Sequence, residues 1–210
     1  MKRYQELIEH HIVKGNMKVL NMLNTKYFIL ADKENGIPMK HTNPDALGNA
    51  WPVEHIQWVD NSDAEIAALT GFDPASDAVI DKRYQSVLEG FSAQYDSTAS
   101  IKLVGYEPNH LVYEYQSQLP QMVVFSEIYY SKGWNAYIDG ELTPHIRANY
   151  VLRAMAVPTG KHEVVFKFEP LTYARGEGIA LASSIGIVLL VLGVVVKEYL
   201  NFHEKKKITA

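Results

Sequence analysis

Residues 111–116 (LVYEYQ) and 162–168 (HEVVFKF) alternate between apolar and polar side chains with a period of two. In the second segment Val164 and Phe166 lie on one face of an extended chain, and Lys167 lies on the other. Alternation of this kind is typical of a β-strand that buries one face and exposes the other. The two segments therefore predict strands with one face in a core.

Further strands are expected on both sides of these two segments. They are predicted near residues 101–103, 122–130, 135–138 and 150–157. Six short strands at this spacing are typical of an antiparallel sandwich or barrel. The turn residues agree, because Asp139-Gly140 favours a two-residue hairpin turn and Pro158 and Gly160 suit a tight turn. We expect an antiparallel β-sandwich over residues 96–172.

Residues 1–95 have a mixed α/β pattern. We expect a helix over 1–23 that is broken at Gly15, and strands at 26–30 and 51–59. A further helix is expected to begin at Ser62, because Ser62 and Glu65 fit a capping box in which both side chains bind free backbone N–H groups. The predicted fold class is α+β, mainly β, with a small mixed α/β N-terminal part.

A long apolar segment follows the predicted sandwich. Residues 178–196 (GIALASSIGIVLLVLGVVV) carry no charge. At about 1.5 Å per residue, a helix of this length spans roughly the 30 Å hydrocarbon core of a bilayer. The alternative is a helix in a soluble core, but such helices rarely lack every charge over this length. We expect a single transmembrane helix over residues 177–197.

The flanking charges give the expected orientation. Lys197 and residues 205–207 (KKK) follow the helix, which favours a basic cytoplasmic tail over residues 198–210 and an extracytoplasmic soluble region. Residues 1–20, however, lack the apolar core that a secretory signal needs. We therefore expect upstream membrane spans in a longer protein. The alternative is a tail-anchored protein whose soluble region is cytoplasmic.

Composition excludes several classes of function. The net charge is −4 and the isoelectric point is about 6.1, so nothing favours nucleic acid as a partner. The chain has no cysteine, which excludes disulfides, thiol nucleophiles and cysteine-bound zinc. Glu6, Glu9, His10 and His11 fit neither the zincin motif nor its inverse. We expect a solvated helix face there, with no metal and no cofactor.

Residues 124–140 (VFSEIYYSKGWNAYIDG) hold the densest group of aromatic and acidic side chains. Aromatic rings stack on the apolar faces of sugars, and carboxylates accept hydrogen bonds from hydroxyl groups. Candidate glycan contacts are Glu127, Tyr130, Trp134 and Asp139. The favoured alternative is that Trp134 packs in the core and Asp139 forms a hairpin turn. Nothing near the two carboxylates suggests a shifted pKa, so no catalytic residue is predicted.

Several segments together resemble the C-terminal region of YfhO-like bacterial membrane proteins, especially those of the Bacteroides type. The segments are 24–28 (NTKYF), 43–53 (NPDALGNAWPV), 125–140 (FSEIYYSKGWNAYIDG), 147–152 (RANYVL) and 158–168. The resemblance runs from about Leu20 through the terminal helix. It rests on the order and spacing of these segments.

This resemblance implies a role in the cell envelope. YfhO-like proteins are large and polytopic, and they are similar to GT-C glycosyltransferases, which use lipid-linked sugars and carry their catalytic carboxylate in an early extracytoplasmic loop. Members are implicated in glycosylating envelope polymers such as teichoic acids. This chain lacks the early loop, so no catalytic residue can be assigned to it.

Two hypotheses about function follow. The chain is the extracytoplasmic C-terminal domain and last span of such a protein, non-catalytic by itself. Alternatively, it is a membrane-anchored sandwich that binds envelope glycan or a partner membrane protein. The expected partners are the membrane, other membrane helices, and an envelope glycan or lipid-linked sugar.

Overall fold

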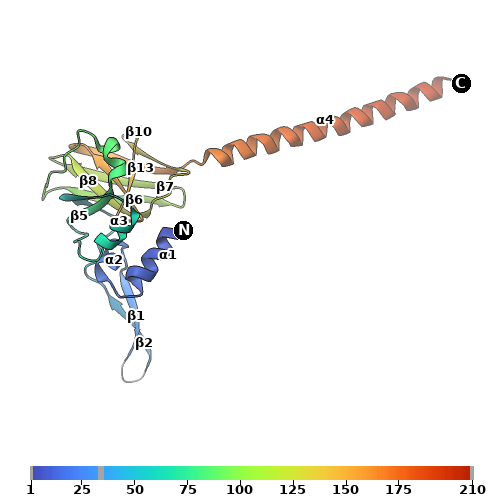
Figure 1. Cartoon of the computed structure of the whole chain (residues 1–210). Coiled ribbons are helices and arrows are strands. Elements are labelled where there is room, and N and C mark those ends of the chain that lie inside the picture. The colour runs from blue at the N-terminus through green and yellow to red at the C-terminus, as the bar shows by residue number, and fades with distance from the viewer. Residues whose placement is uncertain (1, 33–35, 209–210) are drawn as a thin grey trace. The chain divides into compact units, whose positions relative to one another are not determined.

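The protein is described by a computed structural model that covers residues 2–32 and 36–208 (Figure 1). It forms two compact units, Met1–Phe168 and Glu169–Ala210. Strands outweigh helices, and all but one of the strand pairs described are antiparallel. The predicted α+β class with mainly β structure is therefore confirmed.

Two sheets of the first unit form the expected sandwich. One sheet has the strand order β10 (Glu141–Thr143), β9 (Trp134–Ile138), β13 (Gly160–Phe168), β7 (His110–Ser117), β6 (Ser100–Glu107). The other has the order β11 (Ile146–Ala148), β12 (Leu152–Val157), β8 (Gln121–Ile128), β3 (Ala50–Val53). The short strands β10 and β11 were not expected from the sequence.

The core between these sheets is aromatic. Tyr113 of β7, Phe125 of β8 and Phe166 of β13 are all buried, and their ring centroids lie 4.9–6.2 Å apart in edge-to-face pairs. Such pairs contribute about 0.5–1.5 kcal/mol each beyond the burial of apolar area. The alternation in residues 111–116 and 162–168 therefore places these side chains as predicted.

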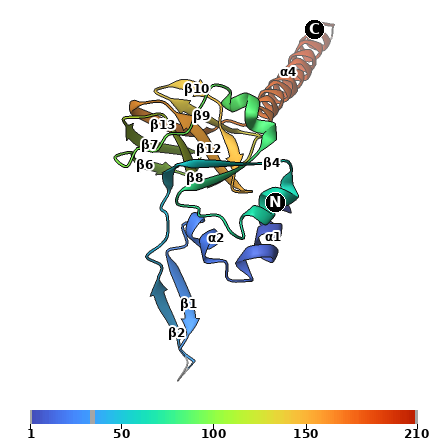
Figure 2. The ribbon, with the colours of Figure 1, turned by 60° about the vertical axis from the view of Figure 1, so that its left-hand side comes forward.

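The four-stranded sheet is covered on its second face as well. Val123 of β8 packs in the core between the sheets, whereas its neighbour Val124 packs in a second core on the opposite face. The N-terminal elements supply that second core (Figure 2). They are α1 (Lys2–Leu7), the π-helix η1 (Ile8–Ile12), α2 (Met17–Met22), β4 (His55–Val59), α3 (Ser62–Ala68), β5 (Asp77–Asp81) and the 3₁₀ helix η2 (Lys82–Leu88).

Two details of this region differ from the sequence prediction. The single strand expected over 51–59 is two strands, because the backbone N–H groups of Glu54 and His55 both donate to the Ser76 carbonyl and interrupt the pairing. β3 then pairs antiparallel with β8, while β4 pairs in parallel with β5.

The second difference concerns the cap of α3. The cap is Asn61, whose side-chain oxygen accepts hydrogen bonds from the N–H groups of Asp63 and Ala64. The capping box predicted at Ser62 is therefore wrong by one residue. Glu65 does not bind the helix end, because its carboxylate is buried against other elements.

Two turns behave as the sequence predicts. Asp139 and Gly140 join β9 to β10 with φ angles of 51° and 87°, as a type I′ hairpin turn requires. Gly15 has a φ of 70° and ends the first helical segment, and Asn16 then caps α2.

A separate two-stranded hairpin, β1 (Tyr27–Ala31) and β2 (Pro38–Thr42), projects from the rest of the first unit (Figures 1 and 2).

The second unit is one helix, α4 (Leu171–Ile208). Its segment Leu171–Tyr199 is long and apolar enough to cross a membrane, and the predicted transmembrane helix over 177–197 lies within it. The helix continues to Ile208, through residues that were expected to form a tail.

Candidate functional site

A cleft of about 1040 Å³ opens on the first unit between α1, the end of β8 and the segment that joins β11 to β12. It is lined by Lys2, Arg3, Tyr4, Gln5, Ile128, Tyr129, Tyr130, Arg147, Tyr150 and Val151. Four of these side chains are tyrosines and three are cations. Among the described residues that line the cleft, none is a carboxylate.

The buried carboxylate of Glu65 lies close to three of the residues that line this cleft. Its Oε2 lies 2.7 Å from Nη1 of Arg3 and 3.9 Å from Nη2 of Arg147. Its Oε1 accepts a hydrogen bond from the backbone N–H of Tyr150 at 3.1 Å. Glu65 thus pairs closely with Arg3, lies at the limit of ion-pair distance from Arg147, and binds one backbone segment. Since a buried charge is tolerated only when it is paired, this arrangement is expected to be rigid.

Tyr150 forms the wall of the cleft nearest α1. Its ring lies 4.4 Å below the guanidinium of Arg3, and its hydroxyl donates a 2.5 Å hydrogen bond to Glu6. Burial and this bond raise the pKa of Tyr150 to about 12, so the hydroxyl stays protonated.

The backbone at this wall is unusual. Asn149 and Tyr150 have φ angles of 48° and 71°, and non-glycine residues with positive φ are uncommon. The conformation is held by a reciprocal pair of hydrogen bonds. The side chain of Asn149 accepts from the N–H of Val79, and the N–H of Asn149 donates to the Val79 carbonyl, both at 2.8 Å.

The side chain of Arg147 is largely buried, with 13% of its surface exposed. Its guanidinium is 5.8 Å from the ring of Tyr129 and 6.0 Å from the ring of Tyr84. Burial raises the pKa of Tyr129 to about 12, so this tyrosine also stays neutral. Glu65 compensates part of the charge of Arg3 and Arg147, and Glu6 lies 3.6 Å from Lys2 Nζ, so three cations and two carboxylates leave the cleft with an excess of one positive charge. Its chemistry suits an anion that also presents apolar faces.

The four residues predicted to contact glycan do not form one site. Tyr130 lines the cleft and is 51% exposed. Trp134 is only partly buried and packs against the sandwich core, with its ring 4.1 Å from the guanidinium of Arg153. Asp139 lies beyond the opposite end of β9, where it accepts hydrogen bonds from His162 Nδ1 and the Glu163 N–H.

Glu127 belongs with Trp134 and Arg153 rather than with the cleft. Arg153 is 2% exposed, and its Nε donates to the Ile128 carbonyl at 3.2 Å. Burial raises the pKa of Glu127, although the nearby charge of Arg153 opposes this shift. The expectation that nothing near the carboxylates shifts a pKa was therefore wrong. The pKa of Asp139 is shifted too, downwards, mainly because His162 is bonded to its carboxylate.

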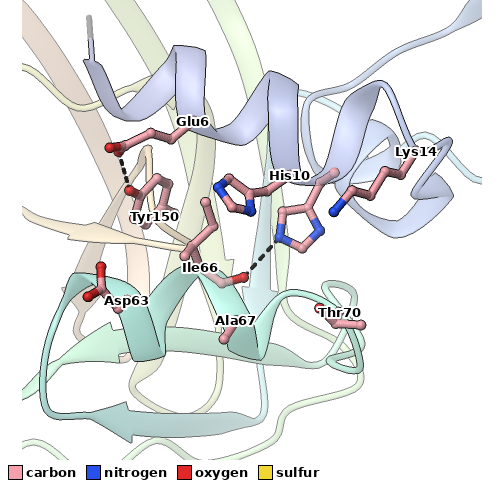
Figure 3. Close-up of a pocket in the computed structure, with 9 residues that line it drawn as sticks. Glu6, His10, Lys14, Asp63, Ile66, Ala67, Thr70 and Tyr150 are labelled. Carbon is pink, nitrogen blue, oxygen red and sulfur yellow. Dashed lines mark hydrogen bonds between the residues drawn. The ribbon is translucent and has the colours of Figure 1, made fainter.

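A smaller pocket of about 350 Å³ lies on the other side of Tyr150, between η1 and α3 (Figure 3). His11 was expected on a solvated face, but it is buried there. Its Nε2 bonds to the Ile66 carbonyl, and its Nδ1 bonds to the Asn16 side chain. Glu9 and His10 are exposed. Within residues 2–32 and 36–208, no three His, Asp or Glu side chains are grouped so as to hold a metal ion.

The sequence prediction missed most residues of the cleft. Arg3, Glu65, Arg147 and Tyr150 come from three distant segments, and no spacing rule brings such segments together. Arg147 and Tyr150 do occur in the segment RANYVL, which was noted only for its family resemblance.

Comparison with known proteins gives one match. The model of the family described as "Bacterial membrane protein YfhO" matches residues 84–179, which run from η2 through the sandwich into the start of α4. No curated protein and no solved structure matches the chain. The matched residues include the Tyr129, Arg147 and Tyr150 side of the cleft, whereas α1 lies outside them. Residues 84–179 are therefore a YfhO-like region of a membrane protein.

Proposed function

We propose that this chain is the extracytoplasmic C-terminal domain and last membrane span of a YfhO-like protein. In this role its cleft binds an anionic saccharide of the cell envelope, a lipid-linked sugar phosphate or a phosphate-bearing glycopolymer, during sugar transfer. The YfhO-like region and the span-length helix support the membrane setting. The basic residues after the apolar segment favour a cytoplasmic C-terminus.

This proposal rests on the composition of the cleft. Arg3 is held in place by Glu65, so little side-chain entropy is lost when it binds an anion. Within the described residues, Nε and Nη2 of Arg147 have no hydrogen-bond partner, so they are available to an anion. Guanidinium groups match the geometry of phosphate oxygens. Tyr129 and Tyr130 add aromatic surface on which a sugar ring can stack.

The chain is proposed to be non-catalytic by itself. Glu65 is buried and paired with two arginines, and Glu6 is bonded to Tyr150, which lowers its pKa. Neither carboxylate is placed to accept a proton from a bound acceptor. Glu127 has the raised pKa that a general base needs, but it lies with Arg153, outside the residues that line the cleft.

Binding can be tested with the whole chain in detergent. The ligands are glycerol-phosphate oligomers and uncharged glucose oligomers of equal length. We expect the phosphate oligomer to bind more tightly, with an affinity that falls as salt is raised. Tyr130→Ala should weaken binding by roughly 2- to 10-fold, as the loss of one aromatic contact implies.

Tyr106→Ala is the matched control, because Tyr106 is also an exposed tyrosine (68%, against 51% for Tyr130) but lies on β6 and does not line the cleft. Equal loss of affinity in both variants, or no preference for the charged ligand, would reject the binding proposal. A glycosyl transfer assay with polyprenyl-phosphate sugars tests the second part. Turnover that is lost in Glu127→Gln would show that the chain is catalytic.

A further inference from the structure

The β1–β2 hairpin exposes more large apolar side chains than any other stretch of the first unit. These side chains are Tyr27, Ile29, Leu30, Ile37 and Met39, and the exposed fraction reaches 75% at Ile29. No residue of either strand is buried, and only Phe28 is partly buried. The hairpin lies outside residues 84–179, so the YfhO-like region does not account for it.

Among the described residues, the hydrogen bonds that join the hairpin to the rest of the unit lie at its base. The N–H of Asn43 donates to the Lys26 carbonyl, and the Asn43 side chain donates to Asn21 and to the Thr25 carbonyl. A two-stranded ribbon is marginally stable in water unless a hydrophobic face is covered. An apolar ribbon held at one end therefore indicates a surface that is covered in the working protein.

The strand register gives the two faces different character. Leu30 lies opposite Met39, and the pair Phe28 and His41 shares their face. Ile37 directly precedes β2 and lies two residues before Met39, so alternation places it on this face as well. Ile29 lies opposite Lys40 on the other face. The first face is the more apolar, and the second carries a cation.

The end of the first unit suggests what covers the apolar face. Only Glu169 and Pro170 separate β13 from α4, so a membrane-embedded α4 keeps the first unit at the bilayer surface. A compact unit of this length has a radius of gyration of roughly 15 Å. The short linker therefore gives the hairpin a high effective concentration near lipid.

The chemistry of the hairpin also suits lipid. The ammonium group of Lys40 lies 4.7 Å from the ring of Tyr27. Tyrosine and lysine are both favoured at the membrane interface, where an apolar body is buried and a polar tip reaches water. A protein partner would account for apolar exposure equally well, but not for its combination with the short tether.

We propose that the β1–β2 hairpin is a second membrane attachment, which lies in the bilayer interface with Leu30, Ile37 and Met39 towards the acyl chains. The bilayer contact would fix the orientation of the first unit, which a single helix with a two-residue linker does not fix. This inference requires α4 to be in the membrane, and it is independent of what the cleft binds.

Single-cysteine labelling provides the test, because the chain has no native cysteine. Leu30→Cys carries an environment-sensitive dye, and the whole chain is reconstituted in vesicles of phosphatidylethanolamine and phosphatidylglycerol. Leu142→Cys is the matched control, since Leu142 is also a highly exposed leucine of the same unit. The dye at residue 30 should shift to shorter wavelength and be quenched by nitroxide-labelled lipid. The dye at residue 142 should remain accessible to aqueous iodide.

Two results would overturn the inference. One is iodide quenching of the dye at residue 30 to the same extent as at residue 142. The other is a dye at residue 30 that is shielded from iodide but not quenched by nitroxide lipid, while unlabelled Leu30→Cys chains form disulfide-linked dimers when an oxidant is added. That result would assign the apolar face to a second copy of the chain. Membrane insertion of α4 is checked in the same samples by resistance to alkaline extraction.

Discussion

At the scale of single residues, Glu65 has the greatest effect on the candidate site, because three elements depend on one carboxylate. Glu65→Gln would leave the guanidinium groups of Arg3 and Arg147 without a compensating charge. Removing one partner of a buried ion pair costs about 3–5 kcal/mol. We expect that loss in the free energy of unfolding, measured by urea titration of the whole chain in detergent.

Glu141→Gln is the control for this prediction, because Glu141 is exposed on β10. Its unfolding free energy should change by less than about 0.5 kcal/mol, as is usual for surface substitutions. An equally small change in Glu65→Gln would mean that Glu65 does not organise the cleft.

His145 gives a prediction about pH. Burial, with the nearby positive charge of Arg153, lowers the pKa of His145 to about 4. The unfolded chain therefore binds a proton near pH 6.5 that the folded chain does not bind until about pH 4. Stability contributed by neutral His145 is lost as the pH falls through this window, by at most about 1.4 kcal/mol per pH unit.

The measurement is the midpoint of urea unfolding between pH 7 and pH 4. His145→Gln removes the titrating group, so its stability should depend less on pH than that of the unaltered chain. His10→Gln is the comparison, because His10 is exposed. If both variants keep the slope of the unaltered chain, His145 is protonated in the folded state.

At the scale of elements, α3 supports the cleft through the placement of Glu65, and its first turn depends on Asn61. Asn61→Ala removes the side-chain acceptor for two backbone N–H groups and should cost about 0.5–2 kcal/mol. Asn61→Asp keeps an acceptor there and should restore most of the stability. Chemical unfolding of the two variants provides the measurement. If Asn61→Ala is neutral, the cap is not at Asn61.

The elements that were predicted correctly are those whose pattern is local. β7 and β13 follow from alternation, the turn at Asp139-Gly140 follows from the φ angles that it needs, and α4 follows from length without charge. The split between β3 and β4 could not be predicted, because it is caused by hydrogen bonds to Ser76, over twenty residues away.

The cleft was missed for the same physical reason. Its cations are placed by contacts between α1, α3 and the segment after β11, and these contacts form only when the second core is packed. Tyr130 was named because aromatic and acidic residues are dense across residues 124–140. Asp139 was named for the same density, but the direction of β9 carries it away from Tyr130.

At the scale of the whole molecule, membrane topology is open to a direct test. A reporter that is active only outside the cytoplasm should be active when inserted between Pro108 and Asn109, in the turn between β6 and β7. The same reporter should be silent when fused after Ala210. The test is made in the native gene, with whatever precedes residue 1 left in place. The reverse pattern would place the first unit in the cytoplasm and remove the basis for an envelope ligand.

The strand order of the four-stranded sheet predicts how fragments of the chain will behave. Residues 96–172 contain eight of the nine sandwich strands, but β3 comes from the N-terminal part and pairs with β8. Without residues 1–95, the face of β8 that carries Val124 would meet water. We expect the fragment 96–172 to be insoluble or to bind hydrophobic dyes, whereas residues 1–168 should give a sharp unfolding transition.

Because the four-stranded sheet is covered on both faces, its structure also limits how this domain could be transferred between genes in evolution. A recombination event that carried only the sandwich into another gene would deliver a protein with an unsealed apolar surface, prone to capture by chaperones and proteases. Descendants should therefore inherit the N-terminal layer together with the sandwich, or replace it with another cover of similar shape. The heritable module is larger than the segment whose strand pattern is visible in the sequence.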